Sequence, residues 1–397
     1  MPANPETTPV ILGAKRTPVG RFLGGLARVP APMLGAYAIE GLLKSLPATK
    51  DRIDEVIMGC VLQAGLGQNP ARQAGLKAGL PDTLSAQTIN KVCGSGLQAV
   101  MLAAQSIKAG DNHVVIAGGL ESMTRAPHFA LMREGIKFGP ATFEDHMAYD
   151  GLRCAFEACA MGDSAEHIAR KYEISREDQD RFAARSHQLA AQATKEGWFR
   201  EEIVTLSPEQ CMNPKGGGVA ADEGIRPESN VEMLAKLRPA FSKEGTITAG
   251  NASQISDGGA AIAVSSMAAA EKMGIAPMAR IIAYHTAGVA PKEIFRAPSL
   301  AIPAVLAKAK LSVKDIDIFE LNEAFAAQSL QNVREVGIPP EKVNICGGAV
   351  AIGHPIGCSG ARVLTTLVHQ MKRLDVRRGL VALCLGGGNS VAMVVER

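Results

Sequence analysis

A cysteine between a β-prone run and a turn of small residues is the first position whose surroundings favour chemistry. The run Gln87–Val92 predicts a short strand, and Cys93 precedes a Gly-Ser-Gly turn and an apolar stripe at helical spacing that begins at Leu97. This order places Cys93 at or just before a helix N-terminus, where free N–H groups and the helix dipole favour negative charge. We therefore expect its pKa to be lowered, which would make it a nucleophile. The alternative is a structural cysteine, because free cysteines are often buried.

Three residues in the C-terminal third have chemistry that could serve a cysteine nucleophile. Asn322 follows a predicted strand, His354 lies in a Gly-His-Pro loop, and Cys384 ends another predicted strand. A lone histidine is more often structural than catalytic. A histidine in an irregular loop between a strand and a helix is different, because open α/β sheets bind ligands at such strand ends.

The elements that must position these residues alternate between strand and helix. Strands are predicted at 10–13, 56–61, 114–119, 246–248, 260–264, 315–319 and 380–383, and helices at 34–46, 176–197, 303–311 and 361–374. The alternation predicts an α/β fold with a mostly parallel sheet and crossover helices.

The second half of the chain repeats the pattern of the first. Small residues at 93–96 open a helix that leads to a strand and two glycines, and small residues at 357–360 do the same about 260 residues later. Residues 124–248 are richer in charged residues than the rest of the chain and hold the only tryptophan, Trp198. The sequence thus predicts one fold used twice, with an insertion between the copies.

Bulk properties narrow the function classes. The chain has 397 residues and a net charge of +3, which favours two or three domains and argues against a general nucleic-acid or membrane-surface binder. No apolar run could span a bilayer, and the N-terminus lacks the layout of a secretion signal or transit peptide. We expect a cytoplasmic protein with free thiols. None of the eight cysteines has zinc-ligand spacing, so we expect no metal.

The motifs taken together are far more specific than any one alone, and the sequence resembles the thiolase family from end to end. The resemblance lies in Arg16-Thr17-Pro18, Asn90–Gly96, Gly119–Met123, Thr248–Ser253, Asn322–Phe325, Gly353-His354-Pro355 and Cys384–Gly387. It implies an α/β, five-layered αβαβα core of two similar halves. The N-terminal half would be 1–123 plus 249–275, a loop domain covering coenzyme A would be 124–248, and the C-terminal half would be 276–397.

The resemblance also implies a reaction. It is the thiolytic cleavage of 3-ketoacyl-CoA, with acetoacetyl-CoA as the expected substrate, and the reverse condensation of two acetyl-CoA. Cys93 resembles the acyl-accepting nucleophile, His354 its base, and Cys384 the acid/base that moves a proton at carbon. Asn322 would hold a water that forms one oxyanion site with His354, and the N–H groups of Cys93 and Gly386 would form the other.

Partners and binding residues follow from the same resemblance. The partners would be CoA thioesters, with no nucleic acid, no membrane, and a homodimer or homotetramer as the assembly. Coenzyme A would be a substrate, and no cofactor would be needed. Arg226 and Ser253 resemble nucleotide and pantetheine contacts, Phe241 and Ala249 resemble apolar wall positions, and Met161 resembles a pocket-lining residue.

The sequence departs from the family pattern away from the catalytic positions. Ile294–Pro298 replaces a usual Met-Gly-x-Gly-Pro loop that borders the acyl pocket, so the larger Phe295 and Arg296 bear on substrate size. The other departures are Ala160 for a common histidine, Cys346 for an asparagine, and Asn389-Ser390 for Met-Gly.

Two other functions remain as alternatives. A 3-ketoacyl-acyl-carrier-protein synthase would share the cysteine half, but such enzymes pair the cysteine with two histidines or with His and Asn. Cys384 argues against this class. A non-catalytic lipid- or CoA-binding relative would have lost a catalytic residue, and none is lost here.

Overall fold

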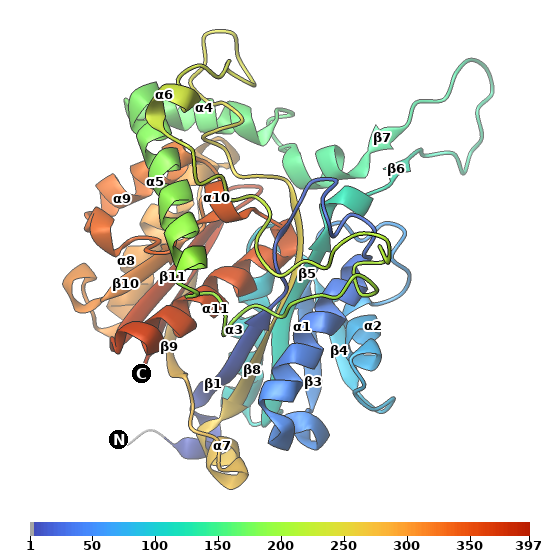
Figure 1. Cartoon of the computed structure of the whole chain (residues 1–397), viewed down its shortest axis with the longest axis vertical. Coiled ribbons are helices and arrows are strands. Elements are labelled where there is room, and N and C mark those ends of the chain that lie inside the picture. The colour runs from blue at the N-terminus through green and yellow to red at the C-terminus, as the bar shows by residue number, and fades with distance from the viewer. Residues whose placement is uncertain (1–3) are drawn as a thin grey trace.

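The computed structural model describes residues 4–397 and is built on one ten-stranded sheet with helices on both sides (Figure 1). The strand order is β10-β11-β12-β9-β1-β8-β5-β3-β4, and β2 pairs with β8. The strands are β1 Pro9–Arg16, β2 Gly20–Arg21, β3 Glu55–Gly59, β4 Ser85–Ile89, β5 Val114–Ser122, β6 His128–Phe129, β7 Glu144–Asp145, β8 Ser256–Ser266, β9 Ala279–Gly288, β10 Ile318–Leu321, β11 Arg378–Leu385 and β12 Asn389–Glu396. The helices are α1 Ala31–Ser45, α2 Pro70–Lys77, α3 Ser95–Ala109, α4 Met161–Lys171, α5 Arg176–Lys195, α6 Val231–Leu234, α7 Met267–Met273, α8 Ala297–Ala309, α9 Ala326–Val336, α10 Ala349–Ile352 and α11 Ile356–Leu374.

The sheet consists of two halves that meet at β1 and β9. These strands pair only through Val10 with Arg280 and Ile11 with Ala279. The largest apolar core contains α3 and α11 together with strands of both halves. A second core packs α1 and α2 on the outer face of the N-terminal half, and a third packs α8 and α9 on the outer face of the C-terminal half. The helices α3 and α11 thus lie between the two halves of the sheet, and the helices of the other two cores lie outside them. This order confirms the predicted five-layered αβαβα arrangement of two similar halves.

The sheet is mixed, so the prediction of a mostly parallel sheet is wrong. Among its described pairs, β3–β4, β3–β5 and β10–β11 are parallel, and β1–β8, β1–β9, β2–β8, β5–β8, β9–β12 and β11–β12 are antiparallel. The connection from β11 to β12 spans only residues 386–388. Such a short connection permits only antiparallel pairing.

The strand predicted at 246–248 is also absent. The N–H groups of Thr246 and Ile247 instead donate to the carboxylate of Glu166 in α4, at 2.9 and 2.8 Å. A side-chain acceptor thus takes the place of a neighbouring strand for the backbone of this β-prone stretch.

Glycines allow the two central helices to touch at their N-terminal ends. A Cβ atom at Gly96 would lie 2.7 Å from the nitrogen of Ala361, and one at Gly360 would lie 2.3 Å from the nitrogen of Leu97. Real Cβ atoms do not approach backbone atoms so closely. The small residues that open α3 and α11 therefore bring the two helix starts, one from each half, side by side.

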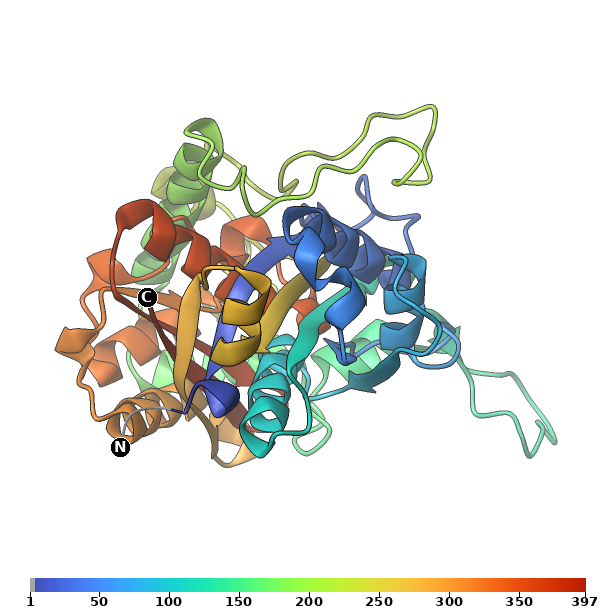
Figure 2. The same ribbon diagram turned by 90° about the horizontal axis from the view of Figure 1, so that it is seen from below.

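Residues 124–248 run between β5 and β8 and carry α4, α5 and α6, which lie over the C-terminal half (Figures 1 and 2). Fully buried Arg16 of β1 holds this segment, because its guanidinium lies 2.7 Å from Glu202 and 2.6 Å from Asp222. A thin arm that contains the β6–β7 pair projects away from the body (Figure 1). The predicted domain boundaries stay a prediction.

Candidate active site

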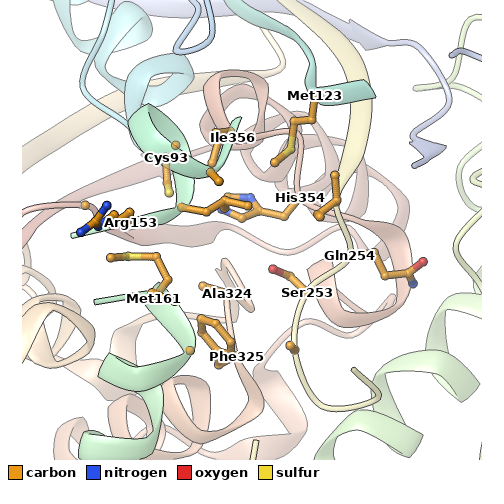
Figure 3. Close-up of a pocket in the computed structure, with 18 of the residues that line it drawn as sticks. Cys93, Met123, Arg153, Met161, Ser253, Gln254, Ala324, Phe325, His354 and Ile356 are labelled. Carbon is orange, nitrogen blue, oxygen red and sulfur yellow. The ribbon is translucent and has the colours of Figure 1, made fainter. Parts of the chain in front are cut away.

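One cavity of about 760 Å³ collects most of the residues singled out from the sequence (Figure 3). Nine of the ten line it: Cys93, Met161, Arg226, Phe241, Ala249, Ser253, His354, Cys384 and Gly386. They come from both halves and from the inserted segment. The tenth, Asn322, is fully buried outside the cavity wall.

A strained turn carries Cys93. Val92 has a φ of 48°, which is rare for a β-branched residue and costs about 1–3 kcal/mol. The turn is held by Ser95, whose hydroxyl donates to the carbonyl of Val92 at 2.7 Å and accepts the N–H of Lys91 at 2.8 Å. Since Ser95 also begins α3, the helix fixes the turn, and the sulfur of Cys93 projects into the cavity (Figure 3).

The pKa of Cys93 is not lowered, contrary to the expectation from the helix N-terminus. Burial raises it to about 12. Backbone N–H groups of Gly386 and of Cys93 itself act in the opposite direction, but they do not compensate for the loss of water. The resting group is therefore a neutral thiol. The same two N–H groups lie against its sulfur, where the sequence places an oxyanion site.

His354 is held by a serine that the sequence analysis did not single out. Its Nδ1 lies 2.6 Å from the hydroxyl oxygen of Ser359, and that hydroxyl donates to the carbonyl of Pro355 at 2.9 Å. Ser359 therefore accepts the Nδ1–H of His354, which leaves the lone pair on Nε2. Burial, with a smaller contribution from Arg362, lowers the pKa of His354 to about 3, so the imidazole is a neutral proton acceptor.

Asn322 lies behind the imidazole. It follows β10, and its Nδ2 is 3.5 Å from Nδ1 of His354. Its Oδ1 has no hydrogen-bond partner among residues 4–397. The role predicted for Asn322, to hold a water beside His354, requires such a free acceptor.

Cys384 is the last residue but one of β11 and lines the same cavity as Cys93. It is 1% exposed, and burial raises its pKa well above the usual range. The negative charge that Cys93 would carry as a thiolate raises it further. Both sulfurs are therefore protonated in the resting site, and a thiolate on one of them disfavours a thiolate on the other.

These pKa values predict how Cys93 reacts in the empty enzyme. From about pH 6 to about pH 9 its alkylation by iodoacetamide should accelerate about tenfold per pH unit, because the thiolate fraction of a group with a pKa near 12 rises that steeply. His354, with a pKa near 3, adds no inflection in this range. Mass spectrometry of the Cys93 peptide measures the rate. A plateau across this range would instead show a preformed thiolate–imidazolium pair.

The open side of the cavity is cationic. Arg226 lines it together with Arg21 and Arg153, two residues that the sequence analysis did not single out, against one carboxylate from Glu144. Each arginine comes from a different segment, which is why no run of basic residues signals the group. Arginine forks bind phosphate groups well.

The predicted apolar positions lie on the walls. Phe241 is 41% exposed at the opening. Its ring packs edge-on against the ring of Phe325, with the two ring centroids 6.4 Å apart. Met161 begins α4. Ala160, the residue before it, occupies the N-cap position, where its N–H donates to the carboxylate of Asp163 at 3.0 Å, and it also lines the cavity. Ala249 and Ser253 flank the fully buried Asn251.

The described part of the chain holds no group of three or more His, Cys, Asp and Glu side chains placed to bind a metal ion. None of its helices combines the length and apolar character needed for a bilayer crossing.

Comparisons with known proteins agree along the whole chain. The family models described as "Thiolase, N-terminal domain" and "Thiolase, C-terminal domain" match residues 9–268 and 275–397. The acetyl-CoA acetyltransferase of Chromobacterium violaceum is 51% identical and that of Cupriavidus necator 49%, with 98% of this chain and 99% and 100% of theirs covered. The crystal structure of the Bacillus anthracis acetyl-CoA acetyltransferase superimposes with a TM-score of 0.94 at 40% identity, covering 98% of both chains. The chain belongs to the thiolase family.

Proposed function

We propose that this acyltransferase cleaves 3-ketoacyl-CoA, with acetoacetyl-CoA as the preferred substrate, through an acyl group held on Cys93. As a thiolase the chain catalyses thiolytic cleavage and the reverse condensation. The observation that carries the proposed roles is the meeting of Cys93, His354 and Cys384 in one cavity, although they lie far apart in the sequence.

In the first half-reaction Nε2 of His354 takes the proton of Cys93 as its sulfur attacks the 3-keto carbon. The N–H groups of Cys93 and Gly386 stabilise the negative oxygen that forms. The bond between C2 and C3 then breaks, its electron pair becomes the enolate of acetyl-CoA, and Cys384 donates the proton that completes the methyl group. Each oxyanion donor is typically worth about 3 kcal/mol of barrier.

In the second half-reaction coenzyme A takes the acyl group. Its thiol loses a proton to the thiolate left on Cys384 and attacks the thioester carbon on Cys93, whose sulfur leaves and recovers its proton from His354. The oxygen of the enolate in the first half-reaction would be bound by His354 and by a water on Asn322, whose free Oδ1 supports this role. Protons thus return to their starting atoms after each cycle.

We propose Arg226, Ser253, Phe241, Ala249 and Met161 as contacts of coenzyme A, and residues 124–248 as the loop domain that covers it. The cationic opening formed with Arg21 and Arg153 supports this placement, since coenzyme A carries phosphates at the end remote from its thiol. Coenzyme A is then a substrate, and the reaction above uses no cofactor. All eight cysteines are free thiols, which fits the cytoplasmic location that we propose.

A thiolysis panel tests the function. With free coenzyme A present, the protein should cleave acetoacetyl-CoA fastest among 3-ketoacyl-CoA substrates, and without it mass spectrometry should find an acetyl group on Cys93. The same acyl groups on acyl-carrier protein should react poorly. Preference for the carrier protein would favour the condensing-enzyme class, and binding without turnover would favour a non-catalytic protein.

We also propose that the chain assembles as a homodimer or homotetramer through its projecting arm. Leu131 is 95% exposed, Phe138 99% and Phe143 62%, and such side chains gain by burial against another surface. Light scattering should give a mass of two or four chains of 41.6 kDa. Replacing Leu131 and Phe138 with serine should lower that mass, and an unchanged mass would show that the arm has no part in assembly.

A further inference from the structure

The inner end of the cavity is closed by an aromatic side chain. Cys384, Phe295 and Phe325 belong to one packed cluster and are 1%, 2% and 8% exposed, whereas Phe22 and Tyr149 at the opening are 43% and 49% exposed. A CoA thioester enters from the opening, where the arginines lie. The part of its acyl chain beyond the reacting carbons must therefore point towards the buried end.

Phe295 forms the end wall together with Phe325. The two rings meet edge to face, with centroids 5.2 Å apart. Phe295 lies in the short 3-10 turn Pro291–Arg296, which precedes α8. Met161 and Ile294 pack in the same cluster, so the wall is apolar throughout.

The turn that carries Phe295 is anchored on both sides. Glu293 lies 2.8 Å from His167 and 2.7 Å from Lys171, both in α4. On the other side Arg296 pairs with Glu335 of α9 at 2.7 Å. These contacts oppose any outward movement of the turn when a longer acyl chain presses on the ring.

A buried polar cluster lies directly behind the wall. Asn332 of α9 donates to the carbonyl of Phe295 at 2.9 Å and to the hydroxyl of Ser299 at 3.1 Å, and Gln331 bonds to the same hydroxyl. All three polar side chains are at most 5% exposed. An alkyl chain that displaced Phe295 would have to strip these groups of their partners, which is costly in a buried site.

We infer that Phe295 is a specificity-determining residue that ends the acyl pocket and limits this enzyme to short 3-ketoacyl chains. The inference rests on the proposed function, because it assumes that the acyl group is transferred at Cys93. Phe295 then sets the acyl chain length, and the anchored turn and the buried polar cluster behind it keep the wall in place.

The test compares kcat/KM for 3-ketooctanoyl-CoA with that for acetoacetyl-CoA. In the wild type the longer substrate should be about 10⁴-fold poorer or worse, since it has four more methylenes and a filled pocket discriminates by about tenfold or more for each. Phe295→Ala should bring the two substrates to within about tenfold, and Phe295→Leu should give an intermediate ratio. Phe22→Ala, at the opening, should alter both substrates equally.

The outcomes separate the inference from the function on which it depends. If the wild type cleaves both substrates equally well, or if neither Phe295 variant changes the ratio, the inference is overturned and the function stands. If the wild type cleaves no 3-ketoacyl-CoA and Cys93 acquires no acyl group, the proposed function itself has failed. The leucine variant keeps a large apolar side chain, so it decides the question if the alanine variant does not fold.

Discussion

Replacing Cys93 with alanine should lower the kcat for thiolysis of acetoacetyl-CoA by about 10⁴-fold or more. Loss of the attacking atom of a covalent mechanism removes the whole path, and what remains is the small acceleration from binding and oxyanion donors. A spectrophotometric assay of 3-ketoacyl-CoA disappearance measures the loss. Far-UV circular dichroism should be unchanged, because alanine is small and the turn is held by Ser95.

Cys211 provides the matched control for this variant. It is a fully buried free cysteine that packs against Leu26 and Leu206, in a cluster remote from the cavity. Cys211→Ala should keep normal thiolysis, although it should cost some stability. Normal turnover by the Cys93 variant would disprove covalent catalysis at this position.

Replacing Cys384 with serine should separate the two chemical events. A serine hydroxyl gives up its proton far less readily than a thiol, so carbon–carbon bond formation should fall by about 10³-fold, within the range for loss of a general acid or base. Acylation of Cys93 by acetyl-CoA should continue at a lower rate, because His354 still activates Cys93 and the leaving coenzyme A thiolate can take its proton from water instead of from Cys384. Mass spectrometry follows the acyl-enzyme, and exchange of the acetyl-CoA methyl protons in heavy water follows the second event.

The comparison of these two rates decides the role of Cys384. Persistent acylation with lost methyl exchange supports an acid/base that acts at carbon. An equal fall in both rates would mean that Cys384 serves only to shape the pocket around Cys93.

The sequence predicts the site better than it predicts the sheet. Cys93, His354 and Cys384 stand out because each lies between glycines or at the end of a strand, and the structure brings all three to one cavity. Strand direction does not follow from such local signals. β8 and β12 return antiparallel to their neighbours, and nothing in their composition distinguishes them from parallel strands.

The missed features depend on packing. The helix start at Cys93 predicts a lowered pKa. The segments packed around the sulfur exclude water from it, however, and this burial raises the pKa more than the backbone N–H groups lower it. Ser359 could have been singled out, since it stands in the small-residue turn that opens α11, only five residues after His354. Arg21 and Arg153 could not, because only the folded chain places them near Arg226.

The close approach of α3 and α11 at Gly96 and Gly360 has a consequence for how the enzyme would fail. The nucleophile belongs to one half and its base to the other, so neither half holds a complete reaction centre. A single methyl group at either glycine would wedge the helix starts apart and separate sulfur from imidazole while most of each half stayed folded. A substitution at this contact would therefore abolish activity before it unfolded the protein.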